Sequence, residues 1–380
     1  MMHLLPISRI PIAFVCLASP FANTGHGVDI SSMDRSVVVK SPADMYNFAN
    51  GSWFDRTAIP ADKSYVGAFD DVIEHNLAIL KSVAEKAATS SAGSGNSPAD
   101  LVGTLYREAL DEDSLEAMGS SPPADQLREI DRISYPSSLL AVIAHLDSLS
   151  VDVGFRVTVQ PDAKNSSRML LALSQGGVIL PDRQLYLDSD DRSKAIRAQY
   201  ITTLSKLMTL AKMPDPLGQA TASLGLETVL AKASSTPAEL RSPQENYHLT
   251  KVSDLAVLAP SVDWNRFFER LGASHLSSVN VCQPKFLTTF SETVSNVPVG
   301  QWRSYLRCAV LYAWAPYLSN VFVKTQFSLI SDITGTTLLA PRWKRAITVL
   351  DSILGDAVGQ LLEDLEYFYS SDALPIGKMW

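Results

Sequence analysis

The sequence predicts a mainly α-helical protein that carries one small β-hairpin. Apolar residues such as Ile73, Leu77 and Leu80 recur at steps of three and four, the spacing that places them on one face of a helix. One stretch, 154–175, alternates apolar and polar residues instead. The chain has 380 residues, 46% apolar and 19% charged, which is enough for one large core or two domains. We therefore expect a folded, multi-helix lobe.

The helical spacing recurs along most of the chain. Pro316 should kink or split the run 301–333, because proline lacks the backbone N–H that a helix interior requires. Ser137 or Ser138 is expected to cap a helix that runs to about Leu149. The expected helices begin at Asp70 and cover 70–87, 101–109, 127–133, 138–149, 191–213, 216–234, 253–258, 265–271, 284–297, 301–333 and 342–368.

The hairpin prediction depends on two segments in which apolar residues occur at every second position. Phe155, Val157 and Val159 alternate with polar residues, and the same alternation follows a polar turn. Its members there are Met169, Leu171 and Leu173. A Ser/Gly/Pro stretch at 89–99 is expected to be a surface loop rather than a domain boundary, because similar helices lie on both sides.

The net charge and the N-terminal segment narrow the possible functions and the expected location of the protein. A formal net charge of −8 excludes a nucleic-acid-binding role, which needs clustered Lys and Arg. Residues 1–23 have the order of a secretory signal peptide, and 24–40 read as a flexible tether. The expected location is therefore periplasmic or secreted, with no membrane span and no lipid anchor at Cys16. The remaining cysteines, Cys282 and Cys308, either form one bridge or stay as two free thiols.

No catalytic or metal-binding motif appears in the sequence. A helical zinc site needs two histidines one turn apart with a glutamate as base, and no histidine here has another within four residues. The histidines of the body are His75, His145, His248 and His275. The acidic run Asp188 to Asp191 lacks the glycine and distal glutamate of a calcium loop, so it is interpreted as a helix N-terminus.

The block SQGGVILPDRQLYL, residues 174–187, predicts a special backbone path. Gly176 and Gly177 permit conformations that residues with a Cβ resist, and Pro181 fixes the following turn. Asp182 and Arg183 could pair with each other or with neighbours. From these residues alone we interpret the block as a structural turn with a buried ion pair.

Several blocks in order resemble the neprilysin family of zinc endopeptidases, in its bacterial form similar to oligoendopeptidase O. MYNFANGSWFDRTAIPADKSYVGAFDD, residues 45–71, resembles the entry segment of the family's N-terminal region, and SQGGVILPDRQLYL resembles its LPDR block. Further similar blocks are LYREALDEDSLEAMG, LETVLAKAS, NYHLTKVSDLAVLAPSVDWNRFF and APRWKRAITVLDSILGDAVGQLLEDLEYF. The matched motif residues are Asn50, Gly51, Trp53, Pro60, Gly67, Gln175, Gly176, Gly177, Pro181, Asp182 and Arg183.

The resemblance covers 41–368 and implies a helical lobe that encloses peptides beside a zinc-dependent catalytic part. By resemblance, Phe69 and Asp70 edge a substrate pocket. The basic residues that the family places nearby fall at Tyr65 and Ile73, which cannot hold a peptide carboxylate as a guanidinium does. The family's HExxH and ExxxD motifs have no counterpart here, so the resemblance implies no zinc in this chain, although the intact enzyme uses zinc.

The tail 369–380 departs from the family pattern, with Pro375 and Gly377 where a helix should continue. We therefore expect a premature stop or frameshift, and a chain that is inactive by itself. Two alternatives stay open. One is a split enzyme, in which a separately encoded chain supplies the catalytic half. The other is a non-catalytic protein that binds peptides or acts as a scaffold.

Overall fold

The computed structural model describes residues 44–67, 69–90 and 95–369, with backbone only from 363 onward. The expected leader, tether and most of the divergent tail lie outside these residues. Among the described residues, no helix is long and apolar enough to cross a lipid bilayer.

The described chain is mainly helical, as predicted, and six helices precede the hairpin among the described residues. They are α1 (Met45–Arg56), α2 (Asp70–Ser90), α3 (Pro98–Leu110), α4 (Glu112–Met118), α5 (Ala124–Asp131) and α6 (Pro136–Ser148). α6 begins at Pro136 with Tyr135 as N-cap, so the expected serine caps are wrong by two or three residues. The physical reason is that proline is well tolerated in the first helical turn. Ser138 lies inside that turn and its hydroxyl accepts from the Tyr135 N–H.

The predicted hairpin is confirmed, as β1 (Phe155–Asp162) paired antiparallel with β2 (Asn165–Gln175). It belongs to a four-stranded sheet of order β1-β2-β4-β3, with β3 (Leu249–Lys251) and β4 (Ser278–Val281) added from the later sequence. β4 runs parallel to β2. These two strands were not predicted, because three or four residues are too few to show a period.

The second half returns to helices, and Pro316 splits the long run as expected. A 3-10 turn at Ala315–Tyr317 (η3) separates α14 from α15. The elements are α7 (Arg183–Leu187), α8 (Asp191–Leu210), α9 (Pro216–Ala233), α10 (Pro237–Leu240), η2 (Val252–Asp254), α11 (Leu255–Leu258), α12 (Trp264–Arg270), α13 (Pro284–Asn296), α14 (Val299–Trp314), α15 (Asn320–Thr334) and α16 (Arg342–Tyr369).

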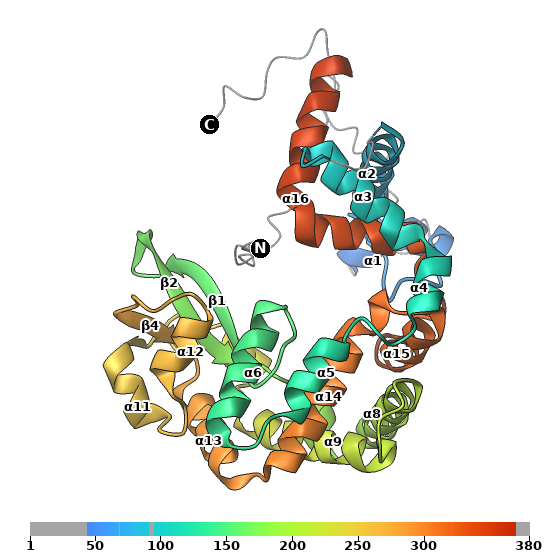
Figure 1. Cartoon of the computed structure of the whole chain (residues 1–380). Helices are drawn as coiled ribbons and strands as arrows, with labels where there is room; N and C mark the ends of the chain where they lie inside the picture. Colours follow the sequence, from blue (N-terminus) through green and yellow to red (C-terminus); the bar gives the residue numbers. More distant parts are fainter. Residues whose placement is uncertain (1–43, 68, 91–94, 370–380) are drawn as a thin grey trace.

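Apolar residues gather in two separate clusters, and the helices that carry them form two groups in Figure 1. The larger cluster fills a body made of α5 to α15 and one face of the sheet. The smaller cluster joins α2, α3 and α16 into a three-helix unit, although α16 lies more than 230 residues after α3 in the sequence. α16 bends at Leu354, whose φ and ψ are not helical. We refer to these parts as the body and the three-helix unit.

Candidate functional site

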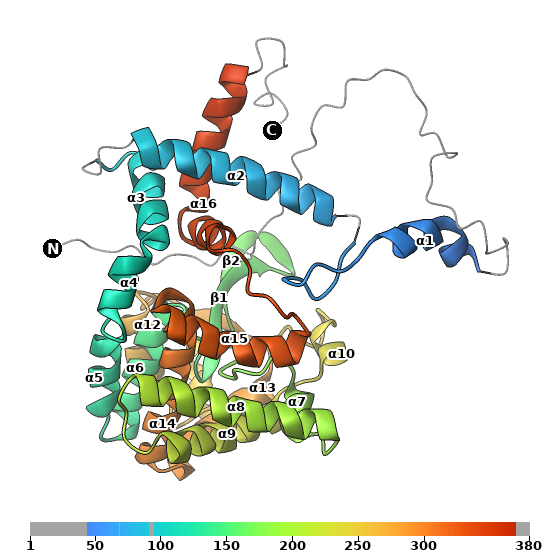
Figure 2. The same cartoon turned by 90° about the vertical axis from the view of Figure 1, so that its right-hand side faces the viewer.

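The entry segment of the family resemblance forms α1 and the chain that leads to α2. Asp44 caps α1 by accepting from the Asn47 N–H at 3.0 Å, and Asn50 donates to the Tyr46 carbonyl at 3.0 Å. The ring centroids of Trp53 and Phe54 lie 5.2 Å apart. α1 extends away from the body in Figure 2. The aromatic residues of this block therefore pack partly against one another within α1.

The chain between α1 and α2 is held in a defined path by backbone hydrogen bonds. The Lys63 N–H donates to the Pro60 carbonyl at 3.0 Å, which closes a turn after the proline. The Ala61 carbonyl accepts from the N–H groups of Thr337 and Leu338 at 2.9 and 3.0 Å. These bonds attach the entry segment to the loop just before α16.

Asp70, at the first position of α2, is bound by its own neighbours. Its carboxylate accepts from the Gly67 N–H at 2.7 Å and pairs with the Lys63 Nζ at 2.6 Å. The Lys63 ammonium, followed by the Gly67 N–H, holds the pKa of Asp70 below its usual value. Asp70 is buried, with 8% of its surface exposed. Its carboxylate therefore positions the start of α2.

A second ion pair continues this cluster toward α16. Lys344 lies 2.7 Å from Glu74, and Lys63 lies 3.1 Å from the same carboxylate. The bond from Lys344, more than the one from Lys63, lowers the pKa of Glu74. The cations of this cluster are therefore Lys63 and Lys344, and both are paired with carboxylates of α2. Lys344 was missed because it approaches only in the folded chain.

Phe69 lies next to this cluster and keeps its ring in solvent. Its side chain is 74% exposed, the most exposed large aromatic of the described residues. A phenyl ring held at a rigid helix start is suited to contact an apolar group of a ligand. The structure thus separates the two predicted pocket residues: Phe69 is free to contact a ligand, and Asp70 is committed to Lys63.

The glycine pair after the hairpin lies in a tightly packed crossing of two chain segments. Gly177 has φ of +71°, and a Cβ there would lie 2.4 Å from the backbone nitrogen of Gly154 and 2.7 Å from the Tyr305 hydroxyl. That hydroxyl accepts from the Gly154 N–H and donates to the Gly177 carbonyl, both at 2.8 Å. The Gly177 N–H donates to Asp152 at 2.9 Å. Only glycine fits this position.

The other members of this block have structural partners. Gln175 exchanges hydrogen bonds with the backbone of Ser235, receiving from its N–H at 2.7 Å and donating to its carbonyl at 3.2 Å. Asp182 caps α7, and Arg183 donates to the Ala231 carbonyl at 3.2 Å. Among the described residues neither Asp182 nor Arg183 forms an ion pair, with the other or with a neighbour, and both are only partly buried, so the expected buried ion pair is wrong. The Asp182 carboxylate is satisfied as a helix cap, and the Arg183 guanidinium is satisfied by a carbonyl in the last turn of α9.

A buried glutamate, which the sequence did not single out, accepts hydrogen bonds from the same block. Glu227 is fully buried on α9 and accepts from the Ile179 N–H at 2.9 Å and the Tyr200 hydroxyl at 2.6 Å. The hydroxyls of Tyr186 and Ser223 also donate to it. Burial raises its pKa to about 7, although the four donors oppose that rise. The only sequence feature that could have identified Glu227 is that it is the one acidic residue within an apolar helical segment.

The metal-ligating residue types do not converge among the described residues. No group of three or more His, Cys, Asp and Glu side chains is arranged to hold a metal ion there. His145 pairs with Glu129, and His248 lies 3.1 Å from the Val281 carbonyl. Cys282 and Cys308 are free thiols. This donor set does not fit the three protein ligands that a catalytic zinc requires.

The fold, a largely helical unit with one small sheet, is similar to that of a bacterial zinc metalloprotease. It matches the crystal structure of the Mycobacterium tuberculosis zinc metalloprotease Zmp1 in complex with an inhibitor, with a TM-score of 0.81 and 28% identity over 87% of this chain and 51% of that one. PepO from Lactobacillus rhamnosis shares the fold, with a TM-score of 0.72 at 18% identity, covering 88% of this chain and 52% of that one.

Residues 43–373 match the N-terminal profile of peptidase family M13, and the chain belongs to that family, the neprilysin family. Endothelin-converting enzyme 1 of Bos taurus is 24% identical over 91% of this chain and 47% of that protein. Neprilysin-11 of Caenorhabditis elegans is 25% identical over 87% of this chain and 41% of that protein. The chain spans about half the length of the curated relatives it matches.

Proposed function

We propose that this chain is the substrate-enclosing N-terminal region of a zinc metalloendopeptidase and that it does not hydrolyse peptides by itself. The observation that carries the proposal is the family match over 43–373 together with a likeness to zinc metalloprotease Zmp1 along most of the chain. The lack of a converging donor set among the described residues supports the second part. In the intact enzyme, zinc would activate the attacking water, and a glutamate would act as base.

In this proposal the entry segment contributes the peptide contact. Phe69 presents an exposed ring beside the Lys63–Asp70 pair, and that pair fixes the helix start from which the ring projects. Apolar side chains of a peptide would pack on the ring, because its edges and face are open to solvent. Asp70 acts as a positioning residue for Phe69 and does not bind the peptide directly.

Turnover by the purified full chain tests the catalytic half of the proposal. An internally quenched peptide is incubated with the chain and zinc chloride, with and without 1,10-phenanthroline. We expect no cleavage that the chelator abolishes, since three protein ligands and a base are required together. Chelator-sensitive turnover that copurifies with the chain would refute the proposal.

Peptide binding tests the other half. Fluorescence anisotropy of a labelled apolar peptide is expected to show saturable binding that Phe69→Ala weakens by about tenfold, the loss of one well-placed aromatic contact. Tyr135→Ala is the matched control, because Tyr135 is also an exposed aromatic, at 55%, but lies at the start of α6. Equal effects of the two substitutions would exclude Phe69 as a specific contact.

A further inference from the structure

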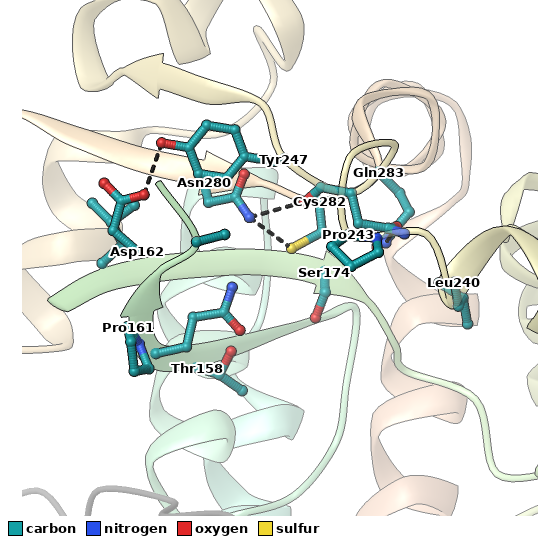
Figure 3. Close-up of a pocket in the computed structure, with 14 residues that line it drawn as sticks. Thr158, Pro161, Asp162, Ser174, Leu240, Pro243, Tyr247, Asn280, Cys282 and Gln283 are labelled. Carbon is teal, nitrogen blue, oxygen red and sulfur yellow. Dashed lines mark hydrogen bonds between the residues drawn. The ribbon is translucent and has the colours of Figure 1, made fainter. Parts of the chain in front are cut away.

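The polar face of the four-stranded sheet forms the floor of a pocket that the functions above do not use (Figure 3). One sheet face carries Phe155, Leu171 and Leu173 into the body core. The opposite face carries the residues that alternate with them on β1 and β2. The loop 240–247 stands beside this face, and together they enclose a cavity of about 270 Å³.

The pocket wall is already fixed by its own hydrogen bonds. Asn280 donates to the Asn246 carbonyl at 3.0 Å and accepts from the His248 N–H at 2.7 Å. Gln283 donates to the Asn246 side-chain oxygen at 2.6 Å and accepts from the Gln175 N–H at 2.8 Å. Each of these amides therefore uses at least one donor and one acceptor to hold the wall itself. A wall tied in this way is formed before any ligand binds.

The one carboxylate of the pocket is also fully used. Asp162 accepts from the Lys164 N–H and the Tyr247 hydroxyl, both at 2.9 Å, and from Arg168 at 2.8 Å. The Lys164 N–H, followed by Tyr247 and Arg168, lowers the pKa of Asp162. Because Arg168 compensates its charge, the pocket offers no unpaired charge to attract an ion. An uncharged ligand is therefore favoured.

Three polar side chains of the floor remain available. Among the described residues, the side chains of Thr158, Gln160 and Ser174 make no hydrogen bond. Thr158 and Gln160 lie two residues apart on β1, which has β2 as its sole described neighbour in the sheet. Their side chains therefore repeat at about 6.6 Å, the distance at which groups on one side of an extended peptide repeat.

Apolar surface completes the site around these free groups. Leu170 lies opposite Gln160 in the strand register, and Leu240, Pro243 and Pro161 line the rim. A pocket with an apolar lining and a few convergent polar groups is the usual form of a specific binding site. A peptide meets both needs, because its amides bond to the floor while its side chains contact the rim.

We propose that this pocket binds an extended, uncharged peptide segment through the side chains of Thr158, Gln160 and Ser174. It is a second peptide contact, distinct from the one at Phe69, and the choice of a peptide as ligand rests on the function proposed above. The pocket belongs to the body and needs no residue of the three-helix unit.

Cys282 supplies a direct reporter, since this partly exposed residue lines the pocket, where its Sγ accepts from the Asn280 amide at 3.3 Å (Figure 3). Methyl methanethiosulfonate modifies the purified full chain in the presence of acetyl-Leu-Ser-Asn-Leu-amide, and mass spectrometry of the digest follows Cys282. At a peptide concentration about ten times the Kd found by calorimetry, modification should slow about tenfold, because only unoccupied chain reacts. Absence of protection together with absence of calorimetric binding would overturn the proposal.

Variants separate this site from the Phe69 contact. Thr158→Val with Ser174→Ala should abolish protection, whereas Gln360→Ala, an exposed glutamine on α16, should leave it unchanged. Phe69→Ala should also retain protection of Cys282. Peptide affinity that falls with Phe69→Ala but persists unchanged in the pocket variant would overturn the second site alone. Protection by maltotetraose but not by the peptide would also overturn it, and unfolding midpoints check that each variant is folded.

Discussion

The body and the three-helix unit are built from the same kinds of residues but differ in how completely they are packed. The body buries large aromatics that contact one another, among them Phe155, Phe290 and Trp302. The apolar cluster of the three-helix unit has eight buried residues, of which Tyr106 is the largest. Burial of apolar area scales with core size. The comparison therefore predicts a stable body and a three-helix unit that opens more easily.

The largest effect is expected where the body is most tightly packed. Gly177→Ala would place a Cβ against the Gly154 nitrogen at a positive φ, so we expect a loss of about 4 kcal/mol or more, or failure to fold. Gly225→Ala is the control, because nothing lies within 4 Å of its added Cβ inside α9. It should be neutral or stabilising by up to about 1 kcal/mol. Guanidinium unfolding compares the two variants.

Truncation of core leucines tests the difference between the two units directly. Leu204→Ala in the body should lower the free energy of unfolding by about 3 to 5 kcal/mol and lower the protection of amide protons from exchange throughout the body. Leu350→Ala in the three-helix unit should cost about 2 to 3 kcal/mol and raise amide exchange mainly in α2, α3 and α16. Hydrogen exchange read by mass spectrometry decides this. Uniform loss of protection in Leu350→Ala would mean that the two units unfold as one.

The buried glutamate of the body predicts a dependence of stability on pH. The pKa of Glu227 rises from 4.5 to about 7 on folding, so the folded chain holds a proton that the unfolded chain has released between these values. Below pH 4.5 the protonated Glu227 makes its full contribution to the free energy of unfolding. This contribution is lost as the pH rises through 7. The loss is about 3 kcal/mol.

Glu227→Gln should remove this slope, because an amide does not titrate in that range. Its neighbours Tyr186, Tyr200, Tyr305 and Cys308 have pKa values raised by burial, so they stay neutral across the same interval. The difference in unfolding free energy between the wild type and Glu227→Gln is measured from pH 4.5 to 8. A difference that is constant across this range would contradict the prediction.

The smallest effect is expected at the link between the entry segment and the three-helix unit. Lys344→Met removes the cation paired with Glu74, and we expect a loss of about 0.5 to 1 kcal/mol that shrinks at high salt. Lys194→Met is the control, since Lys194 pairs with Asp191 at 3.7 Å on an exposed face of α8. Thermal unfolding at two ionic strengths compares them. A larger effect for Lys194→Met would contradict the importance given to this link.

Local patterns in the sequence were sufficient for the hairpin and for most of the helices, but they did not predict α1, α4, α7 or α10. The spacing of Ile73 and Leu77 defined one face of α2, and the alternation from Phe155 to Val159 defined β1, because both periods follow from the backbone geometry of a single segment. Gly177 was also identified correctly as a backbone requirement. The family blocks added the order in which these elements belong together.

Only the tertiary structure decided which distant residues meet. β4 joins β2 through two register pairs, Glu227 collects donors from three other segments, and Lys344 reaches Glu74 across 270 positions. It also showed that Asp70 is bound to Lys63, while Phe69 beside it remains exposed. The physical reason is that the local pattern of a segment records its own period and solvent face, whereas partners from elsewhere are fixed by packing and hydrogen bonding.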